Sequence, residues 1–88
     1  LDALWRLARA LDPGRIEDAA ELVDRFLEET APEIRASGSR DALALLEEAR
    51  QQLAEAREDL ARGDTERAAQ GVRTADSLLR RAAERAGR

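Results

Sequence analysis

Three serines, Ser37, Ser39 and Ser77, are the first candidates for a catalytic nucleophile in this sequence. A serine hydroxyl needs a neighbouring base such as His or Lys to take its proton. The sequence contains no His, Lys, Cys or Tyr, so the usual bases and the alternative nucleophiles are missing. Ser37 and Ser39 also flank Gly38, which fits a loop better than an active site. We therefore predict no nucleophilic catalysis.

The abundant carboxylates are the other candidates, because two opposed carboxyl groups can act as acid and base. The adjacent pairs diverge by about 100° around a helix and fit solvated faces better. A dimetal site in a bundle needs Glu-x-x-His on two helices, and the sequence has no His. Calcium-loop and nucleotide-binding glycine patterns are also absent. We predict no enzyme, no metal and no cofactor. The pairs are Glu28 with Glu29, Glu47 with Glu48, and Glu58 with Asp59.

The charged residues favour a surface of paired side chains. Fifteen basic residues, all Arg, are mixed with nineteen Asp and Glu, for a net charge of −4. Such mixing is typical of a salt-bridged helix surface, and the net charge disfavours nucleic acid. No apolar run approaches the roughly eighteen residues of a membrane span, and residues 1–6 lack a signal-peptide layout. We expect a soluble chain without nucleic-acid or membrane partners, and the sequence does not indicate a cellular location.

Apolar residues recur at three- and four-residue spacing in four segments of the chain. This spacing predicts helices over about residues 1–11, 13–37, 40–62 and 65–86. Short connections make consecutive helices antiparallel neighbours. The expected fold class is all-α: an up-down antiparallel helical bundle with three long helices and a short N-terminal helix, in a single domain over residues 1–88.

Helix-breaking and helix-capping residues stand at each expected boundary. Aspartate or serine accepts hydrogen bonds at a helix start, proline fits the first helical position, and glycine fits the left-handed position after a helix end. The pattern therefore predicts caps at Asp12, Ser39 and Asp64, with Pro13, Gly38 and Gly63 beside them.

Pro32 lies inside the second predicted helix. Proline cannot donate to the carbonyl one turn earlier, and its ring crowds that turn. We expect a kink or a break between Thr30 and Glu33.

The helices over 40–62 and 65–86 alternate small and large apolar residues along one stripe. If Asp64 begins the returning helix, residues whose numbers add to about 126 lie abreast. Small residues then let the backbones approach, and Gly71 relieves a crowded crossing, leaves room for a ligand, or is simply tolerated on the surface. The same rule places Arg50 near Asp76, which predicts a boundary salt bridge in preference to a ligand clamp.

A small-molecule site is one alternative function. Bundle interiors can hold ligands where core residues are small. Here aromatic and aliphatic side chains would form an apolar wall, Thr30 would supply a polar group, and an Ala-rich helix would lie opposite. The alternative interpretation is that the two aromatic residues anchor the core. The candidate binding residues are Trp5, Phe26, Leu27, Thr30, Gly71 and Ala75.

Oligomerisation or docking to another helical protein is a second alternative. Leu43 and Leu45 point to opposite sides of the central stripe, so one of them could stay exposed near Leu78. A self-complementary apolar patch there would give a two-fold dimer. A three-helix core that covers these residues is the competing expectation, and we favour it.

Residues 60–68, Leu-Ala-Arg-Gly-Asp-Thr-Glu-Arg-Ala, resemble the turn of many bacterial helical hairpins, including tetratricopeptide-like ones. The flanking helices are too long for that thirty-four-residue repeat, so no peptide-binding residues follow from the resemblance. In style the chain resembles idealised designed bundles. The leading hypothesis is a non-enzymatic structural bundle of de novo design, whose property is its fold or a helix-mediated contact.

Overall fold

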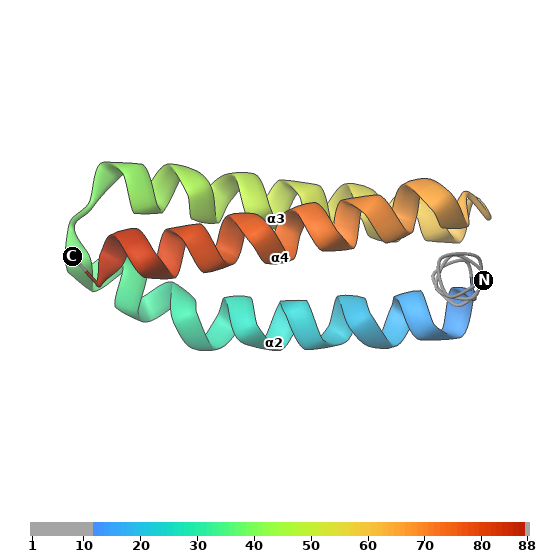
Figure 1. The fold of residues 1–88 in the computed structure, drawn as a ribbon, viewed down its shortest axis with the longest axis horizontal. Coiled ribbons are helices and arrows are strands. Elements are labelled where there is room, and N and C mark those ends of the chain that lie inside the picture. Colours follow the sequence, from blue (N-terminus) through green and yellow to red (C-terminus); the bar gives the residue numbers. More distant parts are fainter. Residues whose placement is uncertain (1–11, 88) are drawn as a thin grey trace, which may run out of the picture.

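The computed structural model describes residues 12–87, which form three α-helices. These are α2 (Pro13–Ser37), α3 (Arg40–Ala61) and α4 (Thr65–Ala86). Each helix runs opposite to the one before it (Figure 1), and the described residues contain no strand. The all-α fold and the three long helices are confirmed, whereas the short helix expected over residues 1–11 lies outside the described residues.

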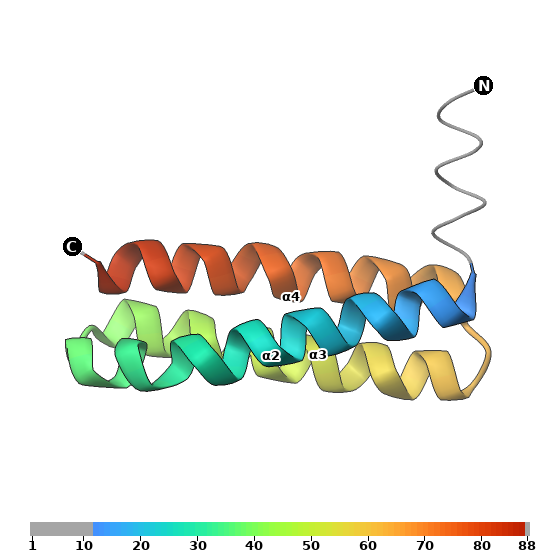
Figure 2. The same cartoon turned by 90° about the horizontal axis from the view of Figure 1, so that it is seen from below.

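The three helices form a triangle in which each contacts the other two, as the two perpendicular views show (Figures 1 and 2). Asp12 caps the start of α2, because its carboxylate accepts a hydrogen bond from the Gly14 N–H at 2.9 Å. Pro13 is the first helical residue, where its missing N–H costs nothing. The predicted start of the second helix is therefore confirmed.

The turn between α2 and α3 has the predicted chemistry at each residue. Gly38 has φ +69°, a left-handed conformation that favours glycine. The Ser37 hydroxyl donates to the Ile34 carbonyl at 2.6 Å. The Ser39 hydroxyl oxygen accepts from the Ala42 N–H at 3.2 Å and so caps α3. These local bonds reverse the chain within two residues.

Replacing this cap tests its contribution. We expect Ser39→Ala to lower the free energy of unfolding by about 1 kcal/mol, because one N–H at the start of α3 loses its partner. Urea denaturation followed by circular dichroism measures the difference. Ser77→Ala is the matched control, because Ser77 is exposed in the middle of α4. Equal midpoints for the two variants would contradict a capping role.

The turn between α3 and α4 uses the same devices. Gly63 has φ +83°, and the Asp64 carboxylate accepts from the Arg67 N–H at 3.3 Å. Glu66 lies in the first turn of α4, where the helix dipole favours a negative charge. The predicted glycine and aspartate roles are both confirmed.

Pro32 lies within α2, which continues to Ser37 without a break. In Figure 1 the axis of α2 turns toward α4 after this point, as expected for a proline that removes one hydrogen bond and crowds the preceding turn. Ile34, on the far side of Pro32, is fully buried. The bend thus carries the last turns of α2 into the core.

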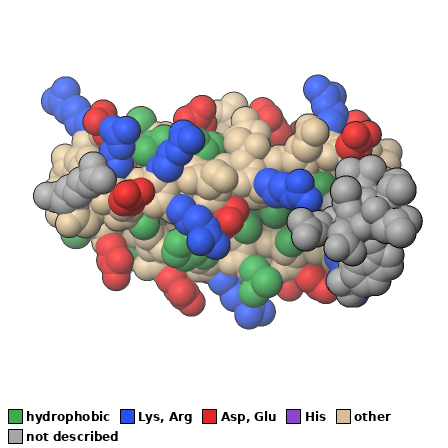
Figure 3. All heavy atoms as spheres, in the orientation of Figure 1, with side chains coloured by type: hydrophobic (Ala, Val, Ile, Leu, Met, Phe, Trp, Pro, Cys, Tyr) green, Lys and Arg blue, Asp and Glu red, His purple; other side chains and the backbone are tan. Residues whose placement is uncertain are grey.

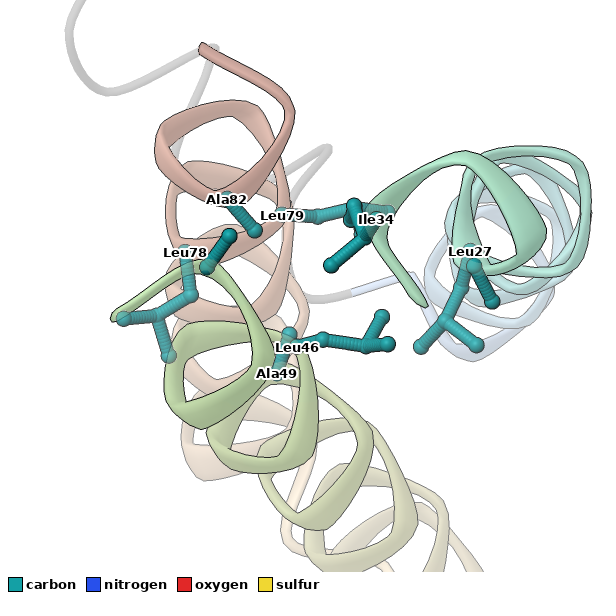
Figure 4. Packing of buried hydrophobic residues seen from close by; sticks show 9 residues of the cluster. Leu27, Ile34, Leu46, Ala49, Leu78, Leu79 and Ala82 are labelled. Carbon is teal, nitrogen blue, oxygen red and sulfur yellow. The ribbon is translucent and has the colours of Figure 1, made fainter. Parts of the chain in front are cut away.

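The core consists of two clusters of buried apolar side chains along the bundle axis. In the first, which we name the Leu46 cluster, side chains from all three helices point into the space between them (Figure 4). The second, the Leu53 cluster, lies nearer the start of α2. The Leu46 cluster comprises Leu27, Ala31, Ile34, Ala42, Leu46, Ala49, Leu78, Leu79 and Ala82. The Leu53 cluster comprises Ile16, Ala20, Val23, Leu53, Ala56, Ala68, Val72 and Ala75.

Helices α3 and α4 meet closely at Gly71. A Cβ atom added to Gly71 would lie 2.8 Å from the Ala56 Cβ and 3.4 Å from the Ala56 Cα. The first distance is shorter than ordinary van der Waals contact, so a side chain at residue 71 would clash with Ala56. Of the three predicted roles of Gly71, relief of a crowded crossing fits this geometry.

Salt bridges between helices lie at the rim of the core. Arg85 Nη1 is 3.1 Å from Asp41 Oδ2. This pair fits the predicted register of α3 and α4, in which residues whose numbers add to about 126 lie abreast. Arg57 Nη2 is 3.9 Å from Asp24 Oδ2 of α2. These side chains are largely exposed, so each pair contributes little to stability.

The predicted bridge between Arg50 and Asp76 is wrong. Asp76 instead binds Arg80 of its own helix, with Nε 3.1 Å from Oδ2. Arg50 lies on the side of α3 that faces α2, where it lines a groove with Leu27. The register rule gives the height of a residue along the bundle, but not the face of the helix that carries it.

Candidate functional site

The residues predicted to bind a ligand are spread over both core clusters. Leu27 is buried in the Leu46 cluster, and Phe26 is half-buried against that cluster. Thr30 is buried, with 7% of its surface exposed. Ala75 is fully buried in the Leu53 cluster. These positions form parts of a packed core and not the wall of one cavity.

The two remaining predicted residues lie elsewhere. Gly71 faces Ala56 across the α3–α4 crossing, and Trp5 lies outside the described residues. Leu27 and Gly71 each line a surface groove, but the two grooves are different ones. None of the three grooves described below is lined by more than one of the predicted residues.

Phe26, Thr30 and Ala75 line none of the following three open grooves on the described surface. One of them, about 290 Å³, lies beside Pro32 between α2 and α3 and includes Arg50. The second, about 470 Å³, follows the α3–α4 seam at Gly71. Its lining is mostly charged, amide and hydroxyl side chains, which are Gln52, Glu55, Glu58, Asp59, Arg62, Arg67, Gln70 and Thr74.

The third groove, about 510 Å³, lies between the start of α2 and the end of α3, and we name it the α2–α3 groove. Its lining combines apolar and charged side chains and includes the residue at which α2 begins. No motif marks this groove in the sequence, because its lining comes from two helices that are distant along the chain. It is lined by Pro13, Gly14, Glu17, Ala20, Glu21, Arg57, Leu60 and Ala61.

The apolar patch expected at Leu43, Leu45 and Leu78 is mostly covered. Leu43 and Leu45 are half-buried against the Leu46 cluster, and Leu78 is 8% exposed. The large apolar residue that the described structure exposes is Leu22, at 64%. Leu22 lies outside the stripe of α2, so the sequence does contain the signal for its exposure. The favoured expectation, a three-helix core that covers the leucines, fits these positions.

Charged side chains of both signs are mixed over the visible face of the molecule (Figure 3). Within residues 12–87, no group of three or more acidic side chains is arranged to hold a metal ion. The described helices also include none that is long and apolar enough to cross a membrane. The described surface therefore offers grooves and paired charges as its candidate sites.

The fold and these grooves define a class: a three-helix bundle with a close Ala/Gly crossing and open surface grooves. Comparison of the chain with protein-family models, with curated proteins and with solved structures finds no match.

Proposed function

We propose that this protein is a non-enzymatic structural bundle whose property is its fold. The observation that carries the proposal is the position of the grooves on the described surface. The three grooves described above open to solvent, and none is lined by Thr30, the residue that would give an interior ligand its polar contact. At Gly71 the α3–α4 crossing is filled by Ala56.

A helix-mediated contact is the second part of the proposal, and the exposed Leu22 limits its size. One exposed leucine is normal on a protein surface. A stable interface buries roughly 800 Å² on each partner, far more than one side chain. We therefore assign no self-association to this face of α2.

Two further hypotheses stay predictions. One is the short helix over residues 1–11, which the spacing of its leucines supports, and the other is the designed origin.

A ligand panel tests the structural function against the small-molecule alternative. The full chain is melted alone and with each member of a set of apolar and amphipathic small molecules. A ligand that binds only the folded state must raise Tm. If the bundle has a purely structural function and binds none of these molecules, no rise in Tm is expected. Trp5 emission, from the one Trp of a chain without Tyr, is followed in the same samples. A dose-dependent rise in Tm together with a shift of Trp5 emission would favour the ligand-binding alternative.

A further inference from the structure

The α2–α3 groove lies where residues 1–11 join the bundle. Pro13 and Gly14 form one end of its lining, and Asp12 is the residue just before them. The inner wall is apolar, with Ala20 from α2 and with Leu60 and Ala61 from α3. Leu60 also packs against the Leu53 cluster, so a side chain lying in the groove would extend that core.

Residues 1–11 carry more apolar surface than a solvated segment usually has. Eight of these eleven residues are apolar. Covering a large apolar side chain contributes about 1.5–3 kcal/mol, so leaving five of them in water forgoes a large stabilisation. The five are Leu1, Leu4, Trp5, Leu7 and Leu11.

The length of the segment matches the groove. From Pro13 to Glu21 the groove follows nine residues of α2, whose ends lie about 12 Å apart at the helical rise. Eleven residues span about 16 Å as a helix and at most about 36 Å when extended. The segment therefore reaches the far end of the groove in either conformation.

The charges of the groove and the segment are complementary. Glu17 and Glu21 lie one helical turn apart on the groove wall, and neither forms a salt bridge with another described residue. Arg57, the cation of the lining, pairs with Asp24. Residues 1–11 contain Arg6 and Arg9, three residues apart, and one acid, Asp2.

We propose that residues 1–11 dock in the α2–α3 groove of their own chain, with their leucines and Trp5 on its apolar wall and their arginines toward Glu17 and Glu21. Direct attachment at Asp12 gives the segment a millimolar effective concentration at the groove. A second copy of the chain reaches such a concentration only in very concentrated solution, so docking within one chain dominates.

Quenching of Trp5 fluorescence by acrylamide tests the docking in the full chain. Acrylamide is neutral, so charge substitutions do not alter its approach. We expect Trp5 to be protected, with equal protection at micromolar and at tenfold lower concentration. Glu17→Arg with Glu21→Arg is expected to raise the quenching constant at least threefold. Asp18→Arg with Glu29→Arg, two exposed positions on the outer face of α2, changes the net charge equally and is expected to leave it unchanged.

A charge swap provides the decisive arm. Adding Arg6→Glu and Arg9→Glu to the Glu17→Arg, Glu21→Arg variant restores the opposite signs and is expected to restore protection. Circular dichroism confirms that each variant is folded. The proposal is overturned by an unprotected Trp5 in the parent chain, by protection that is lost on dilution, which indicates the segment of a second copy, or by an equal response of the two double variants.

A fluorophore that Trp quenches on contact locates the segment independently of charge. The chain has no Cys, so Ala61→Cys at the groove and Ala44→Cys on the far part of α3 each give one labelling site at an exposed position. We expect quenching of bimane at position 61 and not at 44, and its loss when Trp5 is replaced by Phe. Equal emission at both sites would also overturn the proposal.

Discussion

Leu53→Asp is expected to abolish cooperative unfolding of this bundle at neutral pH. Leu53 is 4% exposed and lies in the Leu53 cluster beside apolar residues alone. Replacing a buried leucine by a small residue costs about 2–5 kcal/mol, and burying an unpaired carboxylate adds several more. A chain of this size has a total stability of about 4–13 kcal/mol, so the variant loses most or all of it.

Circular dichroism at 222 nm during a thermal melt measures this result. Ala54→Asp is the matched control, because residue 54 is the exposed neighbour on the same helix and receives the same new charge. We expect a sigmoidal melt for the control and weak, non-cooperative ellipticity for Leu53→Asp. If the two variants melt cooperatively within a few degrees of each other, the core assignment of Leu53 is wrong.

The helix boundaries were predictable because their causes are local. A cap needs one side chain within three residues of the N–H groups that it accepts from, as at Ser39, and a left-handed turn needs one glycine, as at Gly38 and Gly63. The buried stripes follow equally from helical periodicity. For these features the sequence spacing is already the spatial geometry, so no tertiary information is needed.

The candidate site was less predictable, because it depends on how helices pack. Register along α3 and α4 was inferred correctly, as Asp41 and Arg85 show, but the face of Arg50 was not. The α2–α3 groove lies between the start of α2 and the end of α3, and no residue type encodes how these two helix ends pack. Leu27 and Ala75 lie in different clusters. This separation depends on the position of α2 along the bundle axis, which the pairing of residues between α3 and α4 does not give.

Gly71→Val is expected to lower the free energy of unfolding by about 2–3 kcal/mol, the range found for overpacking. The new Cβ would lie 2.8 Å from the Ala56 Cβ, and the two valine methyl groups need additional space. Ala56 cannot move aside, because its side chain is a single methyl group fixed to the backbone of α3. The helices themselves must separate, which loosens the seam on both sides of the crossing.

A control separates this clash from the effect of valine on a helix. Gln70→Val places the same residue at the exposed neighbouring position, where we expect a loss of about 0.5 kcal/mol or less. Urea denaturation gives the free energies of unfolding. Equal losses for the two variants would mean that α3 and α4 approach each other less closely than described here.

A double-mutant cycle assigns the clash to one partner. Gly71→Ala alone gains helix propensity, worth about 1 kcal/mol, but still places its Cβ against Ala56, so we expect a net loss. Ala56→Gly removes the opposing methyl group, and in the double variant the crossing again holds one glycine and one alanine, now on exchanged helices. The coupling energy is therefore expected to be favourable, about 1 kcal/mol. A coupling near zero would show that atoms other than the Ala56 methyl group resist the new side chain. The next candidates are the Ala56 Cα and the Gln52 carbonyl oxygen, 3.4 and 3.5 Å from the added Cβ.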